Sequence, residues 1–433
     1  MKKTLALILA AVMALSLVAC AKTPANGGTE AKGSVYYLNF KPEADQAWQD
    51  LAKTYTEQTG VEVKVVTAAS GQYDTMLTSE LDKSAPPTMF QVGNQGAVNS
   101  YGDFCYPLDN TDVMKEMTTQ DFNLKNANGE TVSIGYCYEA YGIIVNKALL
   151  KQAGYEITDI TNFESLKKVA DDIHARANEL GFDAFSSAGL EGSSSWRFSG
   201  HLANMPLFYE FRDDNVTSQP ATIKGTYLDN FKNVWDLYTT DSATTGAALT
   251  TATGDTSEAE FGQGKAVFFQ NGSWEYANLV DKFGMNPDDL AMIPIYIGVD
   301  GEENAGLCSG TENCWAINSQ AKEEDIQASL DFLYWLVTDP DASAVLVEQL
   351  GAVPFKSCPA SANKFIVDGN ALLADGKYAV TWAFNYTPNV DSWRATVVTA
   401  LAAYSADPTD ANWEAVKTAF VDGWAIEYKT VNG

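Results

Sequence analysis

The stretch VYYLNFKPEADQAWQDLAKTYTEQTGVEVKVV, residues 35–66, decides how this chain folds. Residues 35–38 are aromatic and β-branched and predict a strand, and residues 45–58 predict a helix. Residues 61–66 alternate apolar and polar side chains, which is typical of a second strand. A strand, a helix and a strand in direct succession indicate a βαβ unit and an α/β fold.

The same alternation continues along the chain. A helix is expected at 73–83 and a strand at 88–92. The clearest helix spans 162–180, with Thr161 and Glu164 as a candidate capping box. Further helices are expected at 227–238, 273–281, 322–337, 340–350 and 409–427, and short strands at 266–269, 290–293 and 314–317. The chain is longer than the chains that usually form a single hydrophobic core, which favours two lobes.

Composition argues against several classes of function. The net charge of −28 should repel nucleic acid and anionic lipid surfaces. His174 and His201 are the only histidines in the sequence, so a histidine-rich metal site is not expected. The sequence has no Walker loop, dinucleotide fingerprint, HExxH helix or GxSxG elbow, and we expect neither a cofactor nor a metal. Free cysteines are expected, and a Cys308–Cys314 disulfide is the alternative.

The first residues predict export and anchoring. Lys2 and Lys3 precede an apolar run that is too short for a confident membrane span, so residues 1–19 are expected to be a signal peptide. The residues LVAC that end at Cys20 resemble the bacterial lipobox, in which the cysteine sulfur carries a diacylglycerol. Residues 20–32 would then form a lipid-anchored flexible tether at the extracellular face of the cell membrane.

Five segments together resemble a known family. In chain order they are FKPE at 40–43, PPTMF at 86–90, YGIIVNK at 141–147, FGQGKA at 261–266 and NGSW at 271–274. They are similar to the carbohydrate-binding proteins of bacterial ABC importers, the family that includes maltose-binding protein. Thr88 stands where that family usually has an aspartate. The resemblance extends from about Gly33 to the C-terminus.

The resemblance implies a periplasmic-binding-protein-like fold with two α/β lobes, hinge crossings and a ligand cleft between the lobes. Lobe one would comprise 33–139 with 312–350, and lobe two 140–311 with 351–433. The crossings are expected near Glu139, Gly310 and Gly351, where a few residues would absorb a hinge rotation.

A sugar presents apolar C–H faces and a belt of hydroxyls, so its site needs aromatic plates with polar groups at their edges. The aromatic candidates are Trp274, which matches a stacking position of the family, and Trp196, Trp382 and Tyr386. The polar candidates are Lys41, Glu43, Asn94, Gln95, Glu139, Arg197 and Glu312. Asn94 and Gln95 follow a strand at its carboxyl end, where open α/β sheets bind ligands.

These features predict a monomeric, non-enzymatic protein that captures a sugar, in particular an oligosaccharide, and delivers it to the permease subunits of an ABC transporter. Its membrane contact would be the lipid anchor alone. A polyamine or another small polar solute is the alternative ligand. An anchored glycoside hydrolase with two carboxylates is the alternative activity, because 56 acidic residues make such a pair easy to find.

Overall fold

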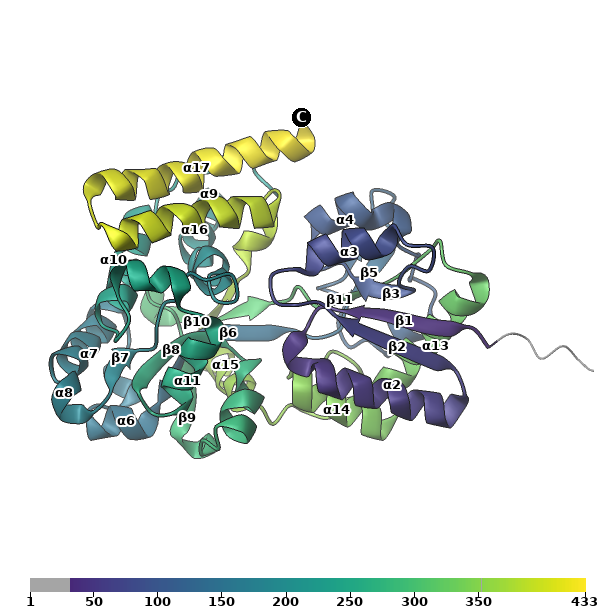
Figure 1. The fold of residues 1–433 in the computed structure, drawn as a ribbon, viewed down its shortest axis with the longest axis horizontal. Helices are drawn as coiled ribbons and strands as arrows, with labels where there is room; N and C mark the ends of the chain where they lie inside the picture. The colour runs from purple at the N-terminus through teal and green to yellow at the C-terminus, as the bar shows by residue number, and fades with distance from the viewer. Residues whose placement is uncertain (1–31, 352) are drawn as a thin grey trace, which may run out of the picture.

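The computed structural model describes residues 32–351 and 353–433, and these form two lobes side by side (Figure 1). Each lobe is built around its own β-sheet with helices on its faces. The expected signal peptide, Cys20 and most of the tether lie outside the described residues. Within the described part of the chain, no helix is long and apolar enough to cross a membrane.

The first lobe begins with the expected βαβ unit. Strand β1 (Ser34–Asn39) pairs in parallel with β2 (Glu62–Thr67), and helix α2 (Asp45–Thr59) connects them. Trp48, Leu51 and Tyr55 form the buried face of α2. The sheet order is β2-β1-β3-β11-β5-β4. The remaining strands are β3 (Met89–Gln91), β4 (Leu124–Lys125), β5 (Thr131–Gly135) and β11 (Cys314–Ile317).

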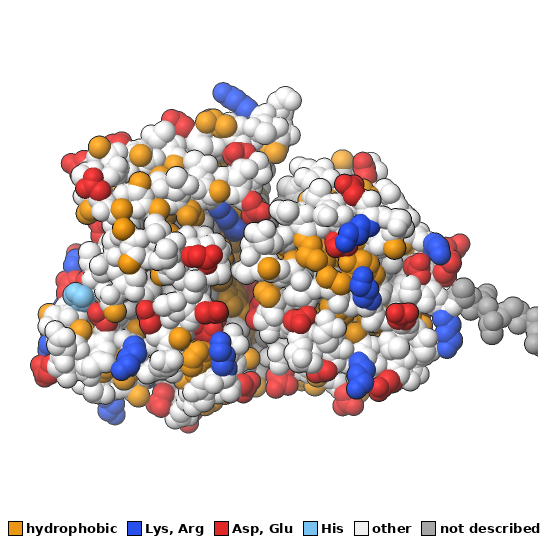
Figure 2. Space-filling model, viewed as in Figure 1, with side chains coloured by type: hydrophobic (Ala, Val, Ile, Leu, Met, Phe, Trp, Pro, Cys, Tyr) orange, Lys and Arg blue, Asp and Glu red, His pale blue; other side chains and the backbone are white. Residues whose placement is uncertain are grey.

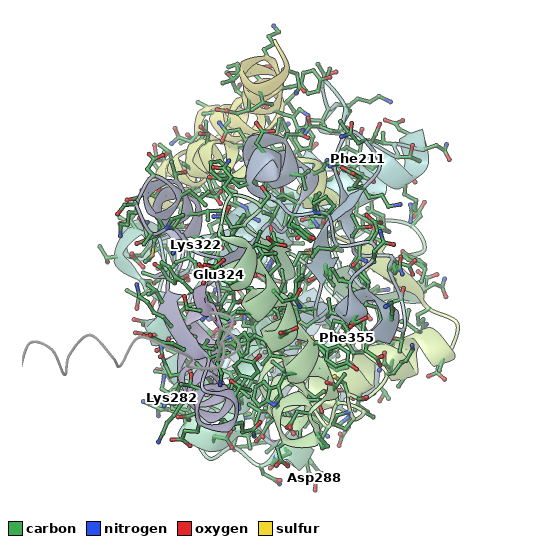
Figure 3. All side chains as sticks on the ribbon, turned by 90° about the vertical axis from the view of Figure 1, so that its right-hand side faces the viewer. Phe211, Lys282, Asp288, Lys322, Glu324 and Phe355 are labelled. Atoms are coloured by element: carbon green, nitrogen blue, oxygen red, sulfur yellow. The ribbon has the colours of Figure 1, made fainter. Side chains whose placement is uncertain are left out.

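Five further helices belong to the first lobe. They are α3 (Tyr73–Leu81), α4 (Gln95–Tyr101), α5 (Asp112–Glu116), α13 (Glu323–Thr338) and α14 (Pro340–Leu350). Helix α14 is not the last part of this lobe, because Phe355, which Figure 3 labels, still packs in the core that contains Trp48 and Trp315. The expected crossing at Gly351 therefore lies before the point where the chain leaves this core.

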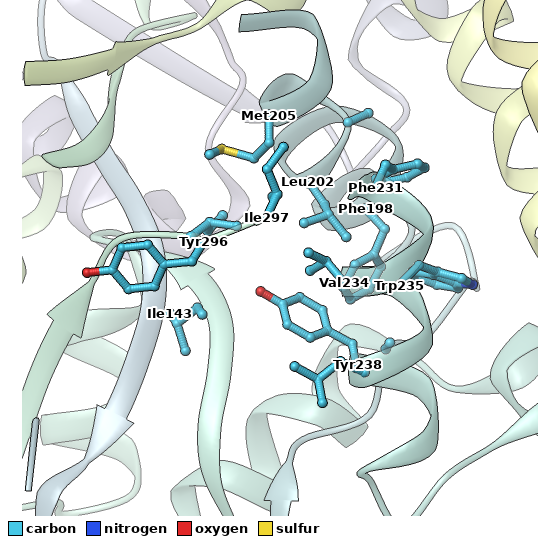
Figure 4. Close-up of a cluster of buried hydrophobic side chains, with 14 of the residues drawn as sticks. Ile143, Phe198, Leu202, Met205, Phe231, Val234, Trp235, Tyr238, Tyr296 and Ile297 are labelled. Atoms are coloured by element: carbon cyan, nitrogen blue, oxygen red, sulfur yellow. The ribbon is translucent and has the colours of Figure 1, made fainter. Parts of the chain in front are cut away.

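The second sheet has the order β12-β10-β6-β8-β7, with β9 also paired to β6. Its strands are β6 (Glu139–Asn146), β7 (Asp183–Phe185), β8 (Ala266–Gly272), β9 (Leu290–Ile293), β10 (Ala305–Gly310) and β12 (Tyr378–Thr381). Helices α6 (Lys147–Gln152), α7 (Phe163–Ala175), α8 (Ala177–Leu180), α9 (Asn204–Asp214), α10 (Leu228–Thr240), α11 (Gly254–Gly262), α12 (Glu275–Ala277), α15 (Lys364–Ala374), α16 (Val390–Ala406) and α17 (Asp410–Asn432) accompany it. Buried Phe198, Leu202, Trp235 and Tyr238 mark its largest core (Figure 4).

Several local expectations were wrong. The cap of α7 is Asn162, whose Oδ1 accepts from the Ser165 amide at 2.9 Å, and the box of Thr161 and Glu164 does not form. Arg176 leaves helical geometry and separates α7 from α8. Residues 273–281 do not form one α-helix, because α12 gives way to a π-helix, η6 (Asn278–Lys282). The Cys308–Cys314 alternative is also wrong, since both residues are free thiols.

Glu302 ties the second lobe together from a buried position. Its carboxylate accepts from the amides of Phe163, Ile297 and Gly298 at 2.7, 2.7 and 2.8 Å. We expect Glu302→Gln to lower the free energy of unfolding by about 2–3 kcal/mol, because charge-assisted hydrogen bonds are lost and an amide N–H then faces N–H donors. Urea denaturation measures this. Glu303→Gln, at the exposed neighbour, is the control, and an equal loss in both variants would contradict the assignment.

Candidate functional site

Five aromatic rings from distant parts of the second lobe surround the imidazole of His201. Trp196, Trp274 and Trp382 place their ring centroids 5.0, 5.3 and 5.9 Å from the imidazole. Tyr141 stacks on the imidazole at 4.1 Å, and Phe384 lies 5.8 Å away. We call these six residues the aromatic cluster. It contains the three tryptophans predicted as ligand contacts.

Two glycines lie directly under tryptophan rings of the cluster, where any larger residue would clash with the ring. A Cβ atom at Gly272 would come within 2.2 Å of the Trp274 ring, and one at Gly310 would come within 2.5 Å of the Trp382 ring. The Trp274 indole N–H also donates to Asn271 Oδ1 at 2.9 Å. The sequence NGSW therefore fixes the plane of Trp274 both sterically and by a hydrogen bond.

Trp274 faces a cavity that both lobes line. The cavity has a volume of about 150 Å³. Its lining is Glu43 and Gln349 from the first lobe with Trp274, Ala277, Asn278, Asp281 and Lys282 from the second. Figure 2 shows a hollow between the two halves, with acidic side chains on both sides of it. Two of the predicted site residues, Glu43 and Trp274, thus line one cavity from different lobes.

Beside this space, a buried ion pair joins the first lobe to the chain crossings. Lys41 follows β1, and its Nζ lies 2.6 Å from Glu139 Oε1 and 2.9 Å from Glu43 Oε1. Glu139 begins β6, and its Oε2 accepts from Asn313 Nδ2 at 2.8 Å. Lys41 and Glu139 have side chains only 3% and 7% exposed. We call Lys41, Glu139 and Asn313 the hinge network.

The hinge network holds its lysine in the charged form. Burial lowers the pKa of Lys41, but the negative charges of Glu139 and Glu43 outweigh that effect and raise the pKa above its ordinary value. The cation is therefore a fixed part of the structure. Neutralising it would leave Glu139 without a counter-charge in a dry environment.

Carboxyl groups around the cleft carry raised pKa values. Burial, reinforced by Glu258, raises the pKa of Glu275 to about 7. Burial also raises the pKa of Glu312, and Arg394 opposes the rise. Both side chains keep partial solvent contact while protein atoms surround them. This is the environment of a narrow cleft, in which charge is poorly hydrated.

Several buried polar atoms at and near the aromatic cluster have no hydrogen-bond partner among the described residues. They are His201 Nδ1, Trp382 Nε1, Tyr141 Oη, Asn313 Oδ1, Asn385 Oδ1 and both polar atoms of the Gln270 amide. Burial, together with the charges of Arg394 and Arg197, lowers the pKa of His201 well below its ordinary value, so the imidazole is neutral. Donors and acceptors are therefore both available there to a ligand.

Some predicted site residues lie away from this cluster. The Arg197 guanidinium is enclosed and donates to Ser187, Ser194, Ser257 and Gln270 at 2.6–3.2 Å. Tyr386 packs on Phe211 and donates to the Thr217 carbonyl, and Gln95 donates to the Lys125 carbonyl. Asn94 caps α4, because its Oδ1 accepts from the Ala97 amide. The preceding residue, Gly93, lies against the Glu312 backbone.

Sequence reasoning missed His201, Tyr141, Phe384 and Asn313. Tyr141 lies inside the segment YGIIVNK, and Phe384 lies two residues from Trp382. Their positions next to recognised features could therefore have made both residues candidates. His201 and Asn313 gave no local signal. His201 belongs to a π-helix, η4 (Arg197–Leu202), and Asn313 to a short interstrand connection.

Comparison with known proteins assigns this chain to a family. The model of the bacterial extracellular solute-binding protein family matches residues 50–370, which is more than half of the chain. A comparison with curated protein sequences finds no match.

Similar solved structures share the fold. RafE, a solute-binding protein of Streptococcus pneumoniae solved with raffinose, has a TM-score of 0.73 at 16% identity and covers 90% of this chain and 99% of its own. A chitin oligosaccharide binding protein has a TM-score of 0.71 at 15% identity, covering 92% and 100%. The GacH receptor of Streptomyces glaucescens, described with acarbose, has a TM-score of 0.67 at 17% identity, covering 92% and 99%.

The hinge network generates a stability prediction. We expect Lys41→Met to lower the free energy of unfolding by about 3–5 kcal/mol, because Glu139 would remain buried without its partner. The double variant Lys41→Met/Glu139→Gln should recover part of that loss. Chemical denaturation measures both. Lys53→Met, in the exposed Lys53–Glu57 pair, is the control and should change stability by less than about 1 kcal/mol. A small effect at Lys41 would contradict the buried-pair argument.

Proposed function

We propose that this chain, which belongs to the family of bacterial extracellular solute-binding proteins, captures an oligosaccharide and delivers it to the permease subunits of an ABC importer. The single observation that carries the choice of ligand is the aromatic cluster. Trp196, Trp274 and Trp382 offer apolar plates, and unpartnered polar atoms of buried side chains lie among and beside them. Plates bordered by donors and acceptors match the surface of a sugar ring.

The structural neighbours support this choice. RafE is described with raffinose, GacH with acarbose, and another neighbour as a chitin oligosaccharide binding protein. Their identities to this chain are low, so the argument from them concerns the kind of cleft and does not identify one sugar. Glu43 of the first lobe and Trp274 of the second line one cavity, which supports a ligand held by both lobes.

We propose binding without catalysis, and a monomer as the working form. The family is one of binding proteins, and the buried carboxylate of Glu139 is paired with Lys41 and Asn313, which leaves it poorly suited to proton transfer. The division into lobes at 33–139 with 312–350 and 140–311 with 351–433 remains a proposal. The position of Phe355 supports a later final crossing.

Trp274 provides the first test of the ligand class. Raffinose, cellotetraose and chitotetraose are screened by thermal shift, and calorimetry on the tightest binder gives the affinity. We expect Trp274→Ala to weaken binding by about 2–4 kcal/mol, because a buried aromatic anchor loses its contact area. Trp335→Ala, at a partly buried tryptophan of the first lobe, is the control and should leave the affinity unchanged.

Two outcomes would remove Trp274 from the site. A variant that keeps both wild-type melting and wild-type affinity shows that the ring does not touch the ligand. A variant that melts far below wild type without ligand shows that the ring is structural, and binding then fails because the fold is lost.

We further propose that the mature chain is anchored through Cys20 at the extracellular face of the cell membrane. Support comes from the lipobox-like residues LVAC and from the small polar residues that follow them. We expect Cys20→Ala to move the protein from the membrane fraction to the medium or to leave an uncleaved signal, which its larger mass reveals. A processed Cys20→Ala product that stays with the membrane would contradict the anchor.

A further inference from the structure

The guanidinium of Arg394 has no bonding partner among the described residues. The sequence contains four arginines. Arg176 and Arg212 pair with carboxylates, and Arg197 donates four hydrogen bonds inside the second lobe. Neither a hydrogen bond nor an ion pair joins the Arg394 side chain to another described residue, and its Nε is buried. In a chain with twice as many acidic as basic residues, this isolation calls for a reason.

Arg394 lies on the side of the second lobe that faces the first. It belongs to α16, which begins next to α4 of the first lobe (Figure 1). Its guanidinium lies over the Phe384 ring, 5.1 Å from the centroid. Phe384 is part of a short 3-10 helix, η9 (Ala383–Tyr386), which also lies against α4. The guanidinium is therefore placed beside the space between the lobes.

The same guanidinium adjoins the aromatic cluster. Phe384, the ring beneath it, lies 5.5 Å from Trp382 and 5.8 Å from His201. A Cβ atom added at Gly200 would come within 2.8 Å of Arg394 Nη2, so the guanidinium also packs against the backbone next to His201. Neither contact is a hydrogen bond. The protein thus holds the cation in place and leaves its N–H groups available.

Further donors without partners lie beside this cation. Trp382 is 7% exposed, and its indole N–H, which can only donate, has no partner among the described residues. His201 is 5% exposed, and its neutral imidazole carries one N–H. Asn385 Oδ1, also in η9, is an unpartnered acceptor. A ligand there can accept hydrogen bonds from a guanidinium and an indole and can donate one to an amide.

Carboxylates in the neighbourhood leave the guanidinium free. Burial raises the pKa of Glu312, and the charge of Arg394 lowers it, yet no ion pair joins these two described side chains. Asp391 lies one turn before Arg394 on α16, but it is exposed, so water screens its charge. Arg394 itself is partly buried. A charge withdrawn from water without a partner is costly, and a bound anion would remove that cost.

We propose that the captured solute is an acidic oligosaccharide, in which the carboxylate of a uronic acid unit binds the Arg394 guanidinium while a sugar ring packs on the aromatic cluster. This inference rests on the proposed function and adds the charge of the ligand to it. A guanidinium and a carboxylate are both planar and can form two parallel hydrogen bonds. A neutral sugar offers Arg394 only hydroxyl groups, which leave its charge uncompensated.

Pairs of sugars that differ in their acid groups test the proposal. The probes are the β-1,4-linked glucuronate tetramer with cellotetraose, and the α-1,4-linked galacturonate tetramer with its methyl ester. Calorimetry at neutral pH and about 0.15 M salt gives the affinities. We expect the acidic member of a pair to bind about 10–100-fold more tightly than the neutral one, because charge-assisted hydrogen bonds are the stronger kind. Added salt should narrow this difference.

Arg394→Gln is the decisive variant, because it keeps a polar side chain and removes the charge. It should lower the affinity for the acidic sugar to that of its neutral counterpart. Arg394→Lys keeps the charge without the planar fork and should retain only part of the preference. Arg212→Gln, at an arginine that pairs with Asp213, is the control and should keep the full preference. Thermal melting without sugar shows whether each variant is folded.

The outcomes separate this inference from the proposed function. Neutral sugars that bind as tightly as acidic ones, or a preference for acidic sugars that survives Arg394→Gln, would overturn the inference and leave the proposed function standing. If Arg394→Gln does not fold, Arg394→Lys decides, and an undiminished preference in that variant would contradict the planar contact. If no probe of either kind binds, both fall.

Discussion

Lys41 and Glu139 form an almost fully buried ion pair at the place where the chain passes from the first sheet to the second. A buried pair of this kind persists only while both charges and their remaining hydrogen bonds are satisfied, which Asn313 ensures from the second crossing. The Tyr136 amide donates to the Asn313 carbonyl at 3.0 Å, so the two crossings also bond to each other. The geometry between the lobes therefore depends on one small polar unit.

The cleft wall depends on that geometry and on steric detail within the second lobe. Trp196, Trp274 and Trp382 come from three separate segments, and each plane is set locally, by an indole hydrogen bond or by a glycine that the ring covers. These local contacts hold the large rings in place before any ligand arrives, so less conformational entropy is lost on binding. The wall is preorganised, and the lobe that faces it supplies carboxylates.

Much of the fold was predictable because its signals are local. The apolar patterns within residues 35–66 predicted β1, α2 and β2 to within a few residues, and the motif NGSW made Trp274 a candidate ligand contact. Helix α9 escaped prediction because residues 204–211 are buried on every face and show no polar stripe. The site was less predictable, because a side chain's direction depends on tertiary contacts. Arg197 is an example, because its guanidinium is enclosed by tertiary contacts inside the second lobe and does not reach the aromatic cluster.

Buried atoms without partners connect the cleft to its movement. Each such donor or acceptor costs about 1–3 kcal/mol when water is excluded and nothing replaces it. Closed lobes around an empty aromatic cluster would therefore leave His201, Trp382 and Asn313 with unmet hydrogen bonds. We propose that the hydroxyl groups of a sugar reach such atoms when the lobes close over it. The sugar would then bind the closed state more tightly than the open one, and this difference in affinity would drive closure.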